Sequence, residues 1–390
     1  MDRKLLCILA SAAISLSMAA CWDHVEINTM LIISGMGLDV DNSGETYHAT
    51  VEFVNVEADR GENIVAEIVE GQGNTLQNAI QDALLAAGGM MFGNHCKVIV
   101  VGEELAKMGL GGVIEMVLRS PDFRKTVEIL VAKDTTAADI FAKDTIVNDI
   151  LSYELSKILR NNEKSVRNTV FTSSYELHET LAGNQSFNLI PAVFVKRNGQ
   201  DNILVVDGCA VLAGDQLQGF IDGEQSKLFQ LIARNKKHVM LTMADGFEDP
   251  VNVNVIDSKV SLFPNVYDDT LFLRINVDAK ATLEKAVLFE TDPMNDDSRK
   301  LIEKHVSEQL STNIAGFFHE VQIEYGSDIF EFYREFQDVY RNHWNDTLQK
   351  DWRSHFRDMD VLVTSNVKIT GSGLIGNYAA ENYDNAVVLP

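Results

Sequence analysis

Apolar and polar residues alternate in the C-terminal half of the chain, and between two such stretches the spacing becomes helical. From Leu271 to Leu283 every second residue is apolar, and those between are mostly polar or charged. This period of two predicts a long strand with one buried face and one wet face. The alternation recurs over residues 251–255 and 361–369, which predicts further strands. One long helix covering that sheet is predicted by the apolar residues at helical spacing, which are Leu301, Ile302, Val306, Leu310, Ile314, Phe317, Phe318 and Val321.

The N-terminal half mixes the two periods over short distances. Extended segments at residues 29–40 and 46–56 flank a turn-forming sequence around Gly44, so we expect a hairpin there. A helix is expected to begin after a capping Thr75 and to end at Gly88. The other expected elements are strands at residues 97–101 and 126–132, helices beginning at Glu103 and over residues 111–118, 135–142 and 149–159, and a loop at residues 161–170.

A turn-rich break, RNGQDN at residues 197–202, marks the main domain boundary that we expect. It separates an N-terminal α/β region over residues 21–200, with room for two subdomains, from a C-terminal α+β domain over residues 201–376. Residues 377–390 are expected to form a loose tail. The predicted fold class is therefore α+β with several domains, in which mixed β-sheets are packed with helices. In the C-terminal part, a largely antiparallel sheet is expected to be covered by long helices.

The first twenty residues have the pattern of an export signal. Arg3 and Lys4 give a positive start, and the sixteen residues from Leu5 to Ala20 are uncharged and small or apolar. Such a run is shorter than the ~20 residues of an ordinary membrane-spanning helix. We therefore expect residues 1–20 to be a signal peptide that is removed.

The end of this signal predicts lipidation. Met18–Cys21 (MAAC) resembles the bacterial lipobox, in which the cysteine is diacylated and becomes the new N-terminus. Two acyl chains suffice for stable anchoring in a bilayer, because each buried methylene contributes about 0.8 kcal/mol. Ser17 and Ala19 would also suit ordinary signal cleavage, so a soluble secreted protein and an uncleaved anchor stay open as alternatives.

The charge balance limits the class of partner. The chain has 33 Lys and Arg against 57 Asp and Glu, a net charge of −24, and removing Asp2, Arg3 and Lys4 with the signal leaves −25. Such a surface repels phosphate backbones, so we expect no nucleic-acid partner. It would not adhere to anionic lipid through charge either, which leaves the acyl chains as the attachment.

Two cysteines remain after Cys7 leaves with the signal and Cys21 is acylated. Export permits a disulfide between Cys96 and Cys209. Both lie in apolar, strand-like sequence, however, and this favours two buried free thiols.

Patterns that resemble ligand sites are each incomplete. GSGLIG at residues 371–376 matches a dinucleotide fingerprint, but too few residues follow for the helix and second strand it requires. DVDNSGE at residues 39–45 begins like a calcium loop, but its twelfth position is Thr50 and strands flank it, so we expect a hairpin turn. No H-E-x-x-H or C-x-x-C spacing occurs. We expect no metal, no cofactor and no catalytic site, although sequence does not reveal a triad assembled from distant segments.

Two arginines flank an acid in RSPDFR, residues 119–124. Arg119 and Arg124, on either side of Asp122, could hold an anion or contact a partner. Ser120 followed by Pro121 is also a common helix start, and we favour this structural interpretation.

Aromatic residues recur every fourth position near the C-terminus. Trp344, Leu348, Trp352 and Phe356 would form one stripe on a single helix. A stripe facing the core is the ordinary explanation, and a groove for a partner is the alternative, since tryptophan is enriched at interfaces.

Several of these segments together resemble one family. CWDHVEIN, SGMGLDVD, HCKVIVVGEELAKMGL, VLRSPDFRKTVEILVA and NHWNDTLQKDWRSHF occur in an order similar to that of the C-subunit of spore nutrient germinant receptors, the Ger(x)C lipoprotein family. The resemblance covers most of residues 21–375. It implies a non-catalytic, multi-domain lipoprotein on the outer face of the inner spore membrane, with Cys21 as the lipid acceptor. It also implies two integral-membrane receptor subunits as partners.

The resemblance gives no role to the other residues of the family pattern. Five of them are candidate partner contacts: Trp22, Arg119, Arg124, Trp344 and Trp352. A lipid-anchored substrate-binding protein with a cleft between two domains stays an alternative, and a surface hydrolase is a third. Only about eight residues separate Cys21 from the strand expected at Met30, so the first domain is expected to sit close to the bilayer.

Overall fold

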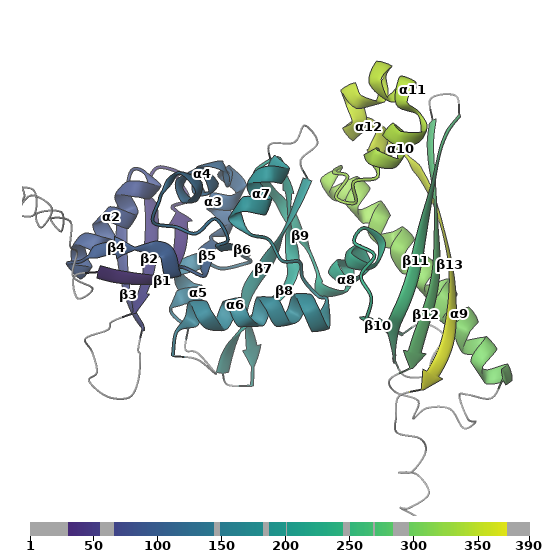
Figure 1. The fold of residues 1–390 in the computed structure, drawn as a ribbon, viewed down its shortest axis with the longest axis horizontal. Helices are drawn as coiled ribbons and strands as arrows, with labels where there is room; N and C mark the ends of the chain where they lie inside the picture. The colour runs from purple at the N-terminus through teal and green to yellow at the C-terminus, as the bar shows by residue number, and fades with distance from the viewer. Residues whose placement is uncertain are drawn as a thin grey trace, which may run out of the picture.

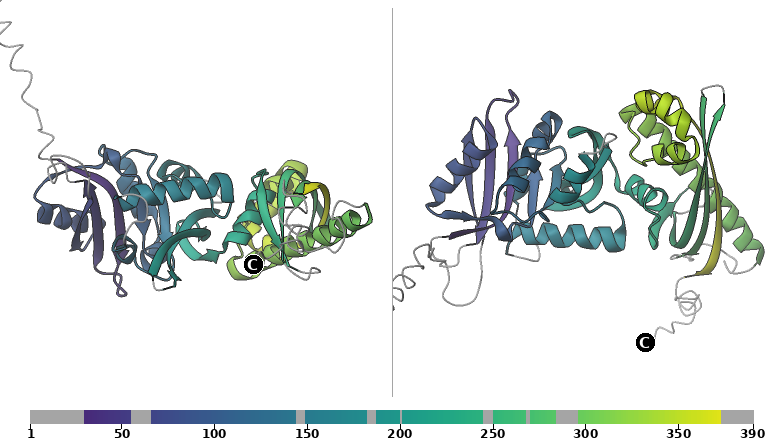
Figure 2. Two further views of the ribbon diagram at one scale, coloured as in Figure 1. Left: turned by 90° about the horizontal axis from the view of Figure 1, so that it is seen from below. Right: turned by 45° about the horizontal axis from the view of Figure 1, so that its top comes forward.

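The structure of the chain is a computed structural model that describes residues 30–54, 66–143, 149–181, 187–199, 201–244, 250–267, 270–283 and 296–372. Within these ranges the chain forms two β-sheets, each packed with helices, arranged along one long axis (Figures 1 and 2). The predicted α+β fold class is confirmed.

The first sheet is mixed, with nine strands among the described residues. It comprises β1 (Met30–Val40), β2 (Tyr47–Val54), β3 (Ala66–Gly73), β4 (Met90–Phe92), β5 (Val98–Val101), β6 (Glu128–Ala132), β7 (Phe187–Asn198), β8 (Asp201–Ala213) and β9 (Gln216–Ile221). The order is β3-β2-β1-β5-β6-β7-β8-β9, and β4 pairs with β1. The central strands run parallel, whereas β2, β3, β8 and β9 add antiparallel hairpins at the two ends. The hairpin predicted around Gly44 is confirmed as β1 and β2.

Helices cover both faces of this sheet, and each face has its own core. One face carries α2 (Leu76–Ala87), α3 (Glu103–Met108), α4 (Gly111–Arg119) and α7 (Ser174–Leu181), and the other carries α5 (Ala137–Phe141) and α6 (Leu151–Asn161). A short 3₁₀ turn, η3 (Gly93–His95), precedes β5. Helix α2 begins and ends as predicted: Thr75 Oγ1 accepts from the Asn78 N–H at 3.1 Å, and Gly88 closes the helix with φ of 71°.

The prediction of a loop at residues 161–170 is wrong for residues 161–166. Helix α6 continues as a π-helical turn, η4 (Asn162–Val166). Arg167 then adopts a left-handed conformation with φ of 63°, and its N–H donates to the Asn162 carbonyl at 2.6 Å. These residues are mostly polar, so no apolar stripe indicated that the helix continues through them. A helix end that is exposed to water does not need such a stripe.

The second sheet has the order β10 (Val239–Met243), β11 (Val251–Tyr267), β12 (Thr270–Leu283), β13 (Asp360–Ser372). The alternation predicted on β12 is confirmed, since its odd-numbered apolar residues from Leu271 to Leu283 are buried. The predicted long helix is α9 (Asp296–Glu320), which packs on this sheet and ends in a π-helical turn, η5 (Val321–Tyr325) (Figure 2). Smaller helices close one end: α10 (Tyr333–Val339), α11 (Arg341–Asp346), the 3₁₀ turn η6 (Leu348–Asp351) and α12 (Trp352–Asp358).

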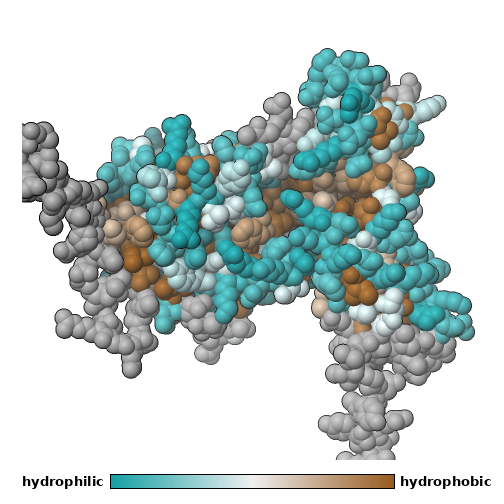
Figure 3. All heavy atoms as spheres, viewed as in Figure 1, coloured by the Kyte–Doolittle hydropathy of each residue, from teal (hydrophilic) through white to brown (hydrophobic). Residues whose placement is uncertain are grey.

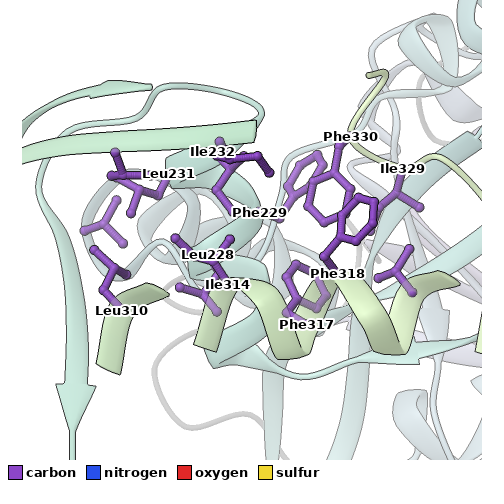
Figure 4. Close-up of a cluster of buried hydrophobic side chains, with 14 of the residues drawn as sticks. Leu228, Phe229, Leu231, Ile232, Leu310, Ile314, Phe317, Phe318, Ile329 and Phe330 are labelled. Atoms are coloured by element: carbon purple, nitrogen blue, oxygen red, sulfur yellow. The ribbon is translucent and has the colours of Figure 1, made fainter. Parts of the chain in front are cut away.

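Helix α8 (Gly223–Ile232) joins the two sheets. It follows β9 directly, and a capping box of Asp222 and Gln225 starts it. Its apolar side chains point at α9 and at Phe330, as Figure 4 shows for Leu228 and Phe229. The same core cluster includes Val211 and Ile221 of the first sheet and the buried face of the second. One continuous core therefore links the two halves.

The first sheet extends beyond the boundary that we expect at residue 200. Strands β8 and β9 follow that residue and pair with β7 and with each other. The division of the chain into independent folding units at residue 200 stays a prediction.

Both remaining cysteines are free and buried, with exposed fractions of 4% for Cys96 and 0% for Cys209. None of the helices in the described ranges is long and apolar enough to cross a membrane.

Candidate functional site

A cavity of about 620 Å³ lies where the two halves of the molecule meet. Helix α7 and the start of β7 line it from the first half, and α8, residues 329–331 and Arg334 of α10 line it from the other side. Apolar residues gather between the hydrophilic surfaces of the two halves in the space-filling view (Figure 3). We call this cavity the interdomain cleft.

Aromatic and aliphatic side chains form the inner wall of the cleft. Phe229 of α8 and Phe330 lie with ring centroids 6.0 Å apart, and Leu189 and Ile329 complete this surface. All four are at most 9% exposed. The Phe330 ring also stacks on the Phe332 ring with centroids 5.0 Å apart, which fixes its position.

Charged side chains surround the opening, and several are already paired. Lys236 Nζ lies 3.3 Å from Glu163 Oε1, and the Arg334 guanidinium lies 2.9 Å from Glu331. Glu176 accepts hydrogen bonds from the Ser173 N–H and O–H, each at 2.9 Å, and so caps α7.

Two charged residues of the opening have no ion pair within the described ranges. Glu179 lies on α7, and the Arg234 guanidinium lies over the Phe229 ring at 5.9 Å. A ligand with a charged end would find both signs of charge here without breaking an existing pair.

One buried polar group of the cleft lacks a partner. Asn188 is 7% exposed and lines the cleft, and its Nδ2 makes no hydrogen bond with the described residues. An unsatisfied buried donor costs about 1–3 kcal/mol, so a ligand or water that accepted from it would recover that energy.

Backbone strain is concentrated beside the cleft. Arg167, Asn235 and Glu331 all have positive φ, at 63°, 46° and 59°. Gln230 Nε2 holds the strained segment by donating to the Arg167 carbonyl at 2.8 Å. Residues held in such conformations tend to cluster where a protein binds or moves.

The size and the walls of the cleft suit the binding of a small molecule. Pockets of about 300–1,000 Å³ with apolar walls and a few polar groups are typical of small-molecule sites. Neither thiol offers a nucleophile, because burial raises the pKa of both Cys96 and Cys209. Within the described residues, no group of three or more His, Cys, Asp or Glu side chains could hold a metal ion.

A smaller hollow of about 330 Å³ lies on the outer side of α6 and is lined largely by basic residues. Lys97, Lys157 and Lys164 contribute to it, together with Arg160, whose guanidinium pairs with the buried Glu128 at 2.6 Å. It is separate from the interdomain cleft.

The residues predicted as sites do not come together in the cleft. Cys21 and Trp22 lie outside the described residues. Arg119 ends α4 and pairs with Glu115 at 2.7 Å, and its side chain is 82% exposed. Arg124 is exposed in the turn that precedes β6.

The helix start expected at Ser120 and Pro121 is wrong. Helix α4 ends at Arg119, and residues 121–123 form a turn in which Ser120 Oγ accepts from the Asp122 N–H at 3.2 Å. The Ser-Pro pair thus closes one helix instead of opening another, because serine can cap a turn as well as a helix.

The aromatic stripe is buried but does not lie on one helix. Trp344 and Trp352 are each 2% exposed and sit on α11 and α12, separated by the turn η6. Their ring centroids lie 5.2 Å apart, and the Trp352 indole N–H donates to Asp328 at 3.1 Å. Neither indole presents a surface to a partner.

The acidic sequence at residues 39–45 forms a hairpin turn, as expected. Asp41 accepts from Ser43 Oγ at 2.8 Å and from the Glu45 N–H at 3.1 Å. Asp39 instead accepts from the Ala137 and Ala138 N–H groups at the start of α5. Most of GSGLIG at residues 371–376, and the tail at residues 377–390, lie outside the described residues.

The residues of the cleft could not be predicted from the sequence, because they come from three distant segments. They fall within residues 163–189, 229–236 and 329–334, and no motif connects them. Phe330 is the clearest single signal, as an aromatic residue in the acidic sequence SDIFEF.

Two family models match the chain in succession. The model described as Spore germination protein N-terminal domain covers residues 23–193, and that described as Spore germination B3/GerAC like, C-terminal, covers residues 207–373.

Curated relatives and a solved structure cover nearly the whole chain. Spore germination protein KC of Bacillus subtilis (strain 168) is 21% identical over 97% of this chain and 98% of its own length. Spore germination protein B3 of the same organism is 20% identical over 93% of this chain and 96% of its own length. The crystal structure of the GerBC protein is similar with a TM-score of 0.53 and 17% identity, over 86% of this chain and 97% of that one. This last likeness shows the fold.

Proposed function

The chain belongs to the Ger(x)C family of spore germination proteins, and from this premise we propose that it is the lipid-anchored C-subunit of a spore nutrient germinant receptor. The observation that carries the proposal is the order of the two family domains over residues 23–193 and 207–373. A lipobox-like sequence ending at Cys21 stands directly before them. In this role the protein is a non-catalytic binding and assembly subunit on the outer face of the inner spore membrane.

Anchoring depends on Cys21. Cys21→Ala is expected to abolish incorporation of a tagged fatty acid such as palmitate and to move the protein from the membrane fraction to the soluble fraction. Cys96→Ala is the matched control and should keep both label and location, because Cys96 is a buried thiol. Unchanged labelling of Cys21→Ala would remove the lipoprotein assignment.

Assembly with two integral-membrane receptor subunits is the second part of the proposal. It is supported by family membership. Affinity purification of the tagged protein from membranes in mild detergent should recover both subunits. Recovery of neither subunit, with the lipidated protein intact, would count against the receptor role.

A lipid-anchored substrate-binding protein is the second candidate, and the interdomain cleft is the observation that favours it. Calorimetry with amino acids, sugars and nucleosides tests it on the soluble part of the chain. Saturable micromolar binding that Asn188→Leu weakens at least tenfold would support it, because loss of one buried hydrogen bond costs about 1–3 kcal/mol. If none of these ligands gave a heat of binding, the substrate-binding candidate would be rejected and only the assembly role would remain.

A further inference from the structure

This acidic chain has several stretches without charged residues, and one of them includes the short strand β4. Residues 83–96, ALLAAGGMMFGNHC, contain no Asp, Glu, Lys or Arg, although the chain as a whole is 23% charged. The stretch includes the end of α2, the short strand β4 and the turn before β5. Where such a stretch is exposed in so acidic a protein, contact with an apolar or anionic surface avoids charge repulsion.

Two large apolar side chains project from this stretch. Leu85 is 78% exposed, the highest value among the large apolar residues of the described chain, and Met90 is 59% exposed. Half-buried Leu31, Leu84 and Met91 lie at the edge of the same core cluster. We call these five residues the apolar corner.

The apolar corner lies beside the point where the described chain begins. Strand β4 pairs in parallel with the first residues of β1, with Met30 opposite Met90 and Leu31 opposite Met91. A Cβ on Gly89 would lie 2.5 Å from Leu31 Cγ, so the end of α2 and the start of β1 are in close contact. Figure 1 shows β4 and β1 together at the end of the molecule farthest from the second sheet, and Figure 3 shows apolar residues gathered there.

The length of chain before Met30 limits what can cover this corner. Nine residue steps separate Cys21 from Met30, and a fully extended chain spans at most about 3.3–3.6 Å per residue, which gives a reach of about 30 Å. Acyl chains on Cys21 would therefore hold this end of the molecule within about one bilayer thickness of the lipid surface.

We infer that the apolar corner is the surface by which the first domain rests on the lipid bilayer, an inference that depends on the proposed acylation of Cys21. Leu85 and Met90 enter the headgroup region, and the uncharged stretch keeps the acidic surface away from the lipid. The long axis of the molecule then points away from the membrane, and the second sheet is presented at its far end.

The test places an environment-sensitive dye on the full-length lipoprotein in vesicles of zwitterionic phosphatidylcholine. Leu85→Cys and Met90→Cys supply the labelling sites, and Leu362→Cys on β13, where the native side chain is 60% exposed, is the matched control. The buried Cys96 and Cys209 do not compete for the dye. We expect a blue shift and severalfold weaker quenching by iodide at positions 85 and 90 when vesicles are present, with stronger quenching there by spin-labelled lipid. Position 362 should keep its aqueous signal.

Other outcomes overturn the inference. Equal iodide quenching at positions 85, 90 and 362, in protein that floats with the vesicles, would show that the corner stays in water. A blue shift that grows with the protein-to-lipid ratio would assign the corner to a second copy of the chain. Failure of the protein to float with vesicles would instead contradict the acylation of Cys21, so the two claims fail in different ways.

Discussion

Asp328 is a buried acid at the centre of the aromatic cluster that includes Trp352. It is 1% exposed, and its carboxylate accepts from the N–H groups of Phe332 and Tyr333 and from the Trp352 indole. Burial raises its pKa to about 6 from an ordinary value of 3.8, against the opposing effect of these three donors. Desolvation thus outweighs hydrogen bonding at this position.

This pKa predicts a specific pH dependence of stability. The folded protein holds the Asp328 proton more tightly than the unfolded chain, so its contribution is fully present below pH 3.8 and is lost as the pH rises through about 6. Between about pH 4 and 7 the free energy of unfolding should fall by about 1–3 kcal/mol from this group. Denaturant unfolding at several pH values should show this slope in the parent.

Asp328→Asn should lack that component of the slope, because the amide does not titrate in this range. The exposed Asp346→Asn is the matched control and should keep the parental slope. A slope in Asp328→Asn equal to that of the parent would mean that other carboxyl groups cause the pH dependence.

Single positions differ in how much the sequence reveals of them. Cys96 and Cys209 were predicted as buried free thiols from their apolar neighbours, and this is confirmed. Glu52 lies in the strand sequence VEFV and has the pattern of a water-facing residue, yet it is 1% exposed. The N-terminus of α6 covers it, and the Leu151 N–H donates to it at 2.8 Å. The two residues are 99 positions apart, so the local sequence around Glu52 does not reveal this contact.

Two helices of the first half, α5 and α6, have carboxylates from distant strands at their N-termini. Glu52 accepts from the start of α6, and Asp39 accepts from the Ala137 and Ala138 N–H groups of α5 at 2.9 and 3.0 Å. The first N–H groups of a helix have no partner within the helix, and negative charge there is favourable. A five-residue helix such as α5 depends on such acceptors, here Asp39 together with the N-cap Thr136, whose hydroxyl accepts from the Asp139 N–H. So few residues cannot sustain a helix alone.

Asp39→Ala is therefore expected to loosen α5. Amide hydrogen exchange at Ala137 and Ala138 should accelerate at least tenfold, and the free energy of unfolding should fall by about 1–3 kcal/mol, since one buried and one partly buried donor lose their acceptor. Asp41→Ala removes the neighbouring acid, which bonds only within the hairpin turn. Exchange at Ala137 and Ala138 that is equally fast in both variants would show that Asp39 is not the cap.

Elements with both a periodic stripe and end signals were predictable, and those shaped by long-range packing were not. Thr75 and Gly88 fixed the ends of α2, and the apolar stripe fixed α9. The stripe from Trp344 to Phe356 failed as one helix. Residues eight apart in a helix are about 12 Å apart along its axis, whereas the two indole rings are 5.2 Å apart. The helix is interrupted at Thr347, and this break lets both rings pack together beside Asp328. The spacing of residues along the sequence does not indicate that packing.

The two halves of the whole molecule are held together by a few contacts besides the core of α8. Tyr325 at the end of η5 reaches the first sheet, where its hydroxyl donates to the Phe220 carbonyl at 3.1 Å. Gln225 of α8 donates to Glu320 of α9 at 2.7 Å. The sequence predicted strands and helices in both halves, but the placement of the two sheets depends on these pairings of distant residues. The sequence therefore suggested a cleft between two domains only in general terms, as a requirement of the alternative function.

Gly219 on β9 makes room for the Tyr325 ring, and this space is the basis of a prediction at the scale of the whole molecule. A Cβ at position 219 would lie 2.8 Å from Tyr325 Cε1, closer than real carbon contacts allow. Tyr325 is 5% exposed, so its ring has little freedom to move aside. Gly219→Ala should displace the ring, weaken the bond to Phe220 and destabilise the protein by about 1–3 kcal/mol.

Gly316→Ala on α9 is the matched control. A Cβ there would meet nothing within 4 Å, and the backbone is helical, so this change should stabilise the protein by about 0.5–1 kcal/mol. Denaturant unfolding measures both changes, and small-angle X-ray scattering measures the radius of gyration. We expect Gly219→Ala to be less stable and more extended than the parent, because the contact it disturbs joins the halves. If Gly219→Ala were as compact and as stable as the parent, Tyr325 would not hold the halves together, and α8 alone would set the geometry of the cleft.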